Sequence, residues 1–116
     1  MSIFMIITID GAIETREYVL PPRPGLDALK RVLRPIFEAQ RAGSHFERVA
    51  IIDENAKPTD MFVDDEGTAF FPPNLAATKH YHRFSISRGR QHMNGIVHDI
   101  PMIYGTAVVF DRQVWF

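Results

Sequence analysis

The chain has 116 residues and a mass of 13.3 kDa, which suits one domain with a single hydrophobic core. It is 46% hydrophobic and 23% charged, as globular proteins are, so we expect one folded domain over residues 1–116. No segment is apolar over the ~20 residues that a membrane span needs, and no signal peptide is recognisable, so we expect a cytoplasmic protein with no membrane partner. The lack of cysteine excludes disulfides, thiolate metal sites and a cysteine nucleophile.

The net charge of -1 hides an uneven distribution along the chain. Residues 1–66 carry twelve acidic and eight basic side chains, whereas residues 67–116 carry two acidic and five basic ones. No Asp or Glu lies between Gly67 and His98, although this stretch holds four of the five histidines. An acid-free basic stretch attracts an anion, because no neighbouring carboxylate in the sequence neutralises its cations.

A β-hairpin is predicted at the start of the chain. Residues 2–9 are almost all apolar, Asp10-Gly11 is a frequent hairpin turn, and residues 12–20 are more polar. We therefore expect a buried first strand paired with a strand at the edge of a sheet.

An amphipathic helix is predicted next, beyond three prolines that end the second strand. Pro35 lacks the backbone N–H of a helix interior, so we expect the helix to kink there or to end and restart. Gly43 is expected to close it. The apolar residues that recur at helical spacing are Leu26, Leu29, Leu33, Ile36 and Phe37.

Two further strands and a second helix are predicted in the middle of the chain. Residues 46–53 are rich in β-branched side chains, and residues 61–64 follow after a turn. Asn74 is a favourable N-cap for a shorter helix that extends to about Arg83.

The last part of the chain is predicted to be a loop followed by a strand. Residues 85–95 show no periodicity, and residues 96–97 are a short apolar segment. Residues 102–110 are predicted to form a strand in which Gly105 marks a bulge. The sequence therefore predicts an α+β fold: a small mixed or antiparallel sheet of about five strands, with one amphipathic helix and one short helix.

Short motifs follow one another between Asp53 and Phe110. They are Phe62-Val63-Asp64-Asp65-Glu66-Gly67, Phe71-Pro72-Pro73-Asn74, Ala77-Thr78, Tyr81 and Tyr104-Gly105-Thr106-Ala107-Val108-Val109. In this order they resemble the signature of a family of small domains of unknown function from phages, plasmids and other mobile elements. The resemblance implies a mobile-element origin and a compact α+β fold, and it transfers no catalytic residue. The basic insert at residues 84–95 departs from the family pattern, and we expect a function particular to this chain there.

Basic side chains of the second half are the candidate ligand-binding residues. Lys79 and Arg83 are one helical turn apart, where like charges cost about 0.2–0.5 kcal/mol unless an anion lies between them. Arg88 and Arg90 flank a glycine and suit bidentate contacts with phosphate or carboxylate groups. The full candidate set is Lys79, Tyr81, His82, Arg83, Arg88, Arg90 and His92.

The nature of the anionic partner is left open by these residues. Tyr81 and Phe84 are placed to stack on bases of a nucleic acid, or instead to pack in the core beneath the helix. The pI of 6.5 argues against a duplex-binding protein, so a small anionic ligand or an acidic protein surface is favoured.

No metal or other cofactor is predicted. On a helix His80 and His82 lie about 200° apart and cannot share an ion, so a metal site would need His92 or His98 from later in the chain. The acids Asp60, Asp64, Asp65 and Glu66 match no standard calcium loop, and we expect them to form a solvated turn.

The preferred hypothesis is a non-enzymatic accessory protein of a phage or mobile element that binds an anionic partner. Given the implied origin, a host-defence component or its anionic nucleotide signal is a candidate target. One alternative is a small metal-dependent phosphoesterase that uses His82, His92 or His98 with Asp64 or Asp99. The other is a homo-oligomer without a ligand, sealed along the edge strand at residues 12–20 or through the apolar end at 114–116.

Overall fold

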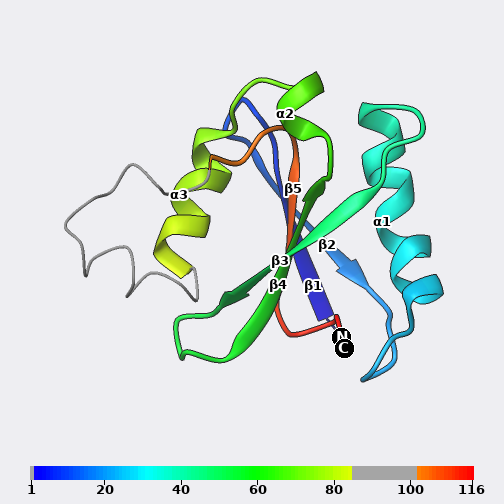
Figure 1. Ribbon diagram of the computed structural model, residues 1–116. Coiled ribbons are helices and arrows are strands. Elements are labelled where there is room, and N and C mark those ends of the chain that lie inside the picture. Colours follow the sequence, from blue (N-terminus) through cyan, green and yellow to red (C-terminus); the bar gives the residue numbers. More distant parts are fainter. Residues whose placement is uncertain (1, 85–101) are drawn as a thin grey trace.

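The computed structural model describes residues 2–84 and 102–116, which form an α+β fold. The strands make one antiparallel sheet in the order β2-β1-β5-β4-β3, with β5 between the two hairpins (Figure 1). The predicted fold class is confirmed, and the four-residue helix α2 is an addition to it. The elements are β1 (Ser2–Ile7), β2 (Ile13–Tyr18), α1 (Leu26–Gln40), β3 (Phe46–Ile52), β4 (Pro58–Asp64), α2 (Gly67–Phe70), α3 (Leu75–Phe84) and β5 (Ala107–Phe110).

The sheet lies between two helical layers, with α1 against one face and α3 against the other (Figure 1). Successive side chains of a strand point to opposite faces, so each central strand supplies both cores. Phe4, Ile6, Phe62, Val108 and Phe110 pack on the α1 side, and Ile7, Met61, Val63, Ala107 and Val109 pack on the α3 side. Burial on both faces explains why β1 and β5 are apolar without alternation.

The outer strands are more polar than the central ones. Only Tyr18 is buried in β2, and an exposed ion pair joins Glu14 to Arg16 at 2.9 Å. The prediction that this segment is an edge strand is therefore confirmed. At the carboxyl end Val114 is fully buried in this chain's own core, whereas Trp115 is half-buried and Phe116 is exposed. The oligomer hypothesis stays a prediction.

Helix α1 continues through Pro35, so the alternative that it ends and restarts there is wrong. The side chain of Pro35 is exposed, and on that side water can bind the carbonyl that loses its intrahelical partner. The helix ends at Gln40, and Gly43 has a positive φ of 75° in the turn that leads to β3.

The predicted N-cap Asn74 is confirmed and has a second structural role. Its side-chain Oδ1 accepts a hydrogen bond from the N–H of Ala77 at 3.0 Å, which caps α3. Its Nδ2 donates to the carbonyl of Ile7 at 2.9 Å and to that of Gly105 at 2.8 Å. The side chain is fully buried, so a single amide joins the start of α3 to β1 and to the segment before β5.

The predicted final strand is shorter in the structure, because residues 102–106 do not pair regularly. Tyr104 makes an isolated bridge with Pro73, and Gly105 follows with a φ of 78°. A Cβ atom at Gly105 would lie 2.9 Å from Cδ2 of Phe71. Glycine is therefore required by the backbone and by this ring rather than by a bulge within β5. The predicted loop at 85–95 and the apolar segment at 96–97 lie outside the described residues.

Replacing Asn74 tests whether this amide holds the two layers together. In Asn74→Ala the helix loses its cap and two buried carbonyls lose their donor, so we expect a loss of about 3 kcal/mol in the free energy of unfolding. Urea denaturation measures this. Asn55 is the matched control, because it is exposed in the β3–β4 turn, and Asn55→Ala is expected to change stability by less than about 0.5 kcal/mol. Equal losses of stability in Asn74→Ala and Asn55→Ala would contradict the structural role of the Asn74 side chain.

Candidate functional site

Helix α3 carries four of the seven predicted ligand-binding residues: Lys79, Tyr81, His82 and Arg83. The other three, Arg88, Arg90 and His92, lie outside the described residues and stay predictions. The helix LAATKHYHRF contains no acidic residue, so any neutralisation of its cations comes from other elements.

The structure places Lys79 and Arg83 on the solvent side of α3. Both are exposed and lie one turn apart, whereas Ala77 and Thr78 are buried on the side that faces the sheet. His82 is half-buried on the same helix. The described part of the candidate site is therefore a convex, basic side of a helix.

Tyr81 lies apart from this basic side. It is half-buried and packs against the α3-side core, and Phe84 does the same. These positions support the alternative in which the two rings belong to the core rather than to a stacking surface for bases. Tyr81 faces the core because it lies about 200° around the helix axis from the exposed Lys79.

Arg83 approaches the acidic first half of the chain. Its guanidinium lies 3.7 Å from the carboxylate of Glu54 in the β3–β4 turn and 5.1 Å from the centre of the Phe84 ring. Arg83 and Glu54 are both largely exposed, so their ion pair is screened by water and contributes little to stability.

A hollow of about 350 Å³ lies beside the basic side, next to the last turn of α3. Arg83 and His80 line it, and so do three acidic residues, Asp53, Glu54 and Asp111. Burial, and then the nearby Arg83, lower the pKa of His80, which favours its neutral form. Among the described residues that line this hollow, acidic side chains outnumber basic ones, which argues against a small anion there.

Metal ligands do not gather in the described parts of the chain. In residues 2–84 and 102–116 no three side chains of His, Asp or Glu are placed to hold one ion. Asp64, which the phosphoesterase hypothesis uses, accepts hydrogen bonds from Arg41, Ser44 and the N–H of Glu66. Its oxygens are thereby occupied by the protein itself. His92, His98 and Asp99 lie outside the described residues.

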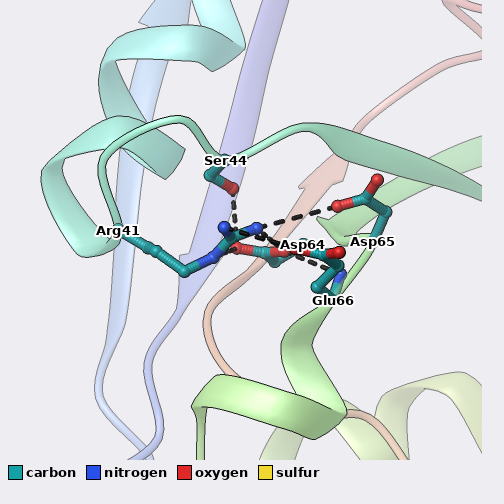
Figure 2. A network of polar contacts seen from close by, with 5 residues as sticks. All are labelled: Arg41, Ser44, Asp64, Asp65 and Glu66. Atoms are coloured by element: carbon teal, nitrogen blue, oxygen red, sulfur yellow. Dashed lines mark hydrogen bonds and ion pairs between the residues drawn. The ribbon is translucent and has the colours of Figure 1, made fainter.

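The contacts of Asp64 form a polar network of five residues (Figure 2). Arg41, just after α1, donates from Nε and Nη2 to the two carboxylate oxygens at 3.1 and 2.7 Å. The hydroxyl of Ser44 donates at 2.6 Å. Arg41 also lies 3.8 Å from Asp65 and 3.5 Å from Glu66. The network therefore joins the end of α1 to the end of β4.

The charge of Asp64 is stabilised despite its burial. Burial raises its pKa, but the hydrogen bonds from Arg41, Ser44 and the Glu66 N–H outweigh this and hold the pKa at about 2. A carboxylate with this pKa and no free oxygen cannot serve as a general base near neutral pH. We interpret this network, called the Asp64 network below, as a structural feature that holds the end of α1 to the end of β4.

The prediction of a solvated acidic turn is wrong for two of its four residues. Asp60 and Asp64 are buried, whereas Asp65 and Glu66 are exposed. Asp60 accepts hydrogen bonds from Arg48 at 2.8 Å and from the N–H groups of Val114 and Trp115 at 2.8 and 2.9 Å. Sequence spacing carries no signal for these partners, because they come from β3 and from the end of the chain.

Comparisons with family models, with curated proteins and with solved structures find no match to this chain. The resemblance to mobile-element domains therefore stays a prediction. Among the described helices, none has the length and apolar character needed to cross a bilayer.

Acid unfolding tests how much the Asp64 network stabilises the fold. A carboxylate with a lowered folded-state pKa stabilises the fold above its unfolded value of 3.8, and this stability is lost as the pH falls through about 2. The shift corresponds to about 2 kcal/mol, so Asp64→Asn should reduce the pH dependence of unfolding in this range by that amount. Urea titrations at a series of acidic pH values measure it.

Two further variants make this result specific. Asp65→Asn alters an exposed neighbour 3.8 Å from Arg41, and we expect it to keep the pH dependence of the native protein. Arg41→Gln removes the principal donor, so the acid transition should move to higher pH. An unchanged transition in Arg41→Gln would show that Arg41 does not lower the pKa of Asp64.

Proposed function

We propose that this protein is a non-enzymatic accessory protein that binds an acidic surface of another protein through the exposed side of α3. One observation carries the proposal. Lys79 and Arg83 are exposed one turn apart on a helix without acidic residues. The sequence extends this basic series with Arg88, Arg90 and His92, which the proposal includes on the sequence alone.

The shape of the site supports a protein partner over a small anion. Small ligands bind in concave sites that bury most of their surface, whereas Lys79 lies on the exposed side of α3 and Arg83 borders a hollow with acidic lining residues. Three of the described residues that line the adjacent hollow are acidic, which disfavours an anion there. Complementary charges on two protein surfaces act at longer range, where they orient the partners and accelerate their association.

The mobile-element resemblance narrows the class of partner that we propose. An accessory protein of such an element acts on components of the host cell, and we propose a host-defence protein with an acidic surface as the target. This step rests on the sequence motifs between Asp53 and Phe110.

A purely structural explanation exists for part of this basic side. Cations in the last turn of a helix interact favourably with its dipole, and His82 and Arg83 occupy that turn in α3. Lys79 lies in the middle of the helix, where this effect is weak. Lys79 is therefore the residue whose replacement best separates binding from helix stability.

Charge reversal at Lys79 tests the proposed surface. As the probe we choose a fluorescent peptide of about 20 glutamates, with a single-stranded oligonucleotide of similar charge for comparison. Lys79→Glu should weaken binding of the peptide about threefold to tenfold, with a larger effect at low salt. Arg31→Glu makes the same charge change on α1, and it should weaken binding less than twofold. Fluorescence anisotropy provides the affinities, and thermal unfolding confirms that both variants fold.

Two outcomes would contradict the proposal. Equal weakening by Lys79→Glu and Arg31→Glu would show that only the total charge matters. Tighter binding of the oligonucleotide than of the peptide, lost in Lys79→Glu, would favour a nucleic acid as the partner of α3.

A further inference from the structure

A second basic surface lies on the α1 side of the sheet, opposite α3. It is a groove of about 290 Å³ between α1, the start of β3 and the last residues of the chain. Lys30 and Arg34 reach it from α1, His45 and Phe46 from β3 and the residue before it, and Trp115 from the carboxyl end. No acidic residue is among the described residues that line it. This distinguishes the groove from the hollow beside α3.

The aromatic wall of the groove is held by the core. Phe46 packs edge-on against the buried ring of Phe62, with 5.5 Å between ring centres, and Trp115 lies 6.3 Å from the same ring. The backbone N–H of Trp115 also donates to the buried carboxylate of Asp60 at 2.9 Å. Phe46 and Trp115 are nevertheless only half-buried. Two rings are thus fixed in position and still accessible from the groove.

The cationic side of the groove is formed by α1. Lys30 and Arg34 are four residues apart on exposed positions, so their charged groups can converge on one anion. Arg34 uses its Nε for Glu38 at 2.8 Å, and no described residue accepts a hydrogen bond from its two terminal nitrogens. The exposed His45 adds a further donor at the edge of the groove.

We propose that this groove binds a nucleoside monophosphate, with the base against Trp115 and Phe46 and the phosphate between Lys30 and Arg34. Aromatic side chains stack on nucleobases, and a guanidinium beside an ammonium matches the oxygens of a phosphate. The volume of about 290 Å³ is just below the range of roughly 300–1,000 Å³ for small-molecule sites, which suits one nucleotide rather than a polymer. The site lies across the sheet from α3, so it is independent of the proposed protein partner.

The single tryptophan of the chain is a built-in reporter for this proposal, because it is Trp115. We would titrate the full chain with adenosine 5′-monophosphate and follow the tryptophan fluorescence, with isothermal calorimetry as a second measurement. Saturable quenching, with a matching binding isotherm, is the expected result. Adenosine and ribose 5-phosphate should each bind at least about tenfold more weakly, because each lacks one of the two contacts.

Variants of α1 assign the binding to the groove. Lys30→Ala and Arg34→Ala should each weaken the binding of adenosine 5′-monophosphate about threefold to tenfold. Arg31→Ala removes an equal charge from the same helix but does not line the groove, and it should leave the affinity within about twofold. All three replace an exposed residue with a good helix former, so the fold should be retained.

The proposal is overturned by any of three results. The first is the absence of both quenching and heat at millimolar nucleotide. The second is binding of ribose 5-phosphate as tight as that of the nucleotide, which would remove the role of the rings. The third is that Arg31→Ala weakens nucleotide binding as much as Lys30→Ala and Arg34→Ala do. This would show that the positive charge of α1 attracts the nucleotide without a defined site.

Discussion

Burial of the central strands on both faces is the constraint from which the rest of this structure follows. β1, β5 and β4 present large apolar side chains to each side of the sheet, so a helix must cover each face. Helices α1 and α3, which both carry exposed cations, are thereby separated by the sheet (Figure 1). As a consequence the described residues form two separate cationic surfaces, whose environments differ.

Two buried carboxylates of β4 connect this layered core to its periphery. Asp64 binds Arg41 at the end of α1, and Asp60 binds the backbone of the carboxyl-terminal residues. Each carboxylate is desolvated and therefore needs several donors, which only a defined arrangement of neighbouring segments supplies. These interactions favour one arrangement of the segments and take both acids out of any catalytic role that needs a free oxygen.

We propose different partners for the two cationic surfaces because the side chains around their cations differ. On α3, Lys79 and Arg83 are exposed, and the hollow that Arg83 borders has acidic residues in its described lining. On α1, Lys30 and Arg34 border a groove that includes the rings of Phe46 and Trp115 and has no acidic residue in its described lining. The first arrangement favours a broad acidic surface, and the second favours a nucleotide, which has a planar base and a charged phosphate. We therefore propose the two partners separately.

The sequence by itself determined the fold class, the edge strand β2, the amphipathic helix α1 and the cap at Asn74, because these depend on local periodicity and capping chemistry. It did not reveal the pairing of Arg41 with Asp64, the donors of Asp60, or the meeting of Lys30, Arg34 and Trp115 around one groove. Those partners are far apart in the chain, and their contact depends on how β5 enters the sheet and where each helix packs. Only the tertiary structure decided them, since side-chain patterns record which face of an element is buried but not which distant residue will cover it.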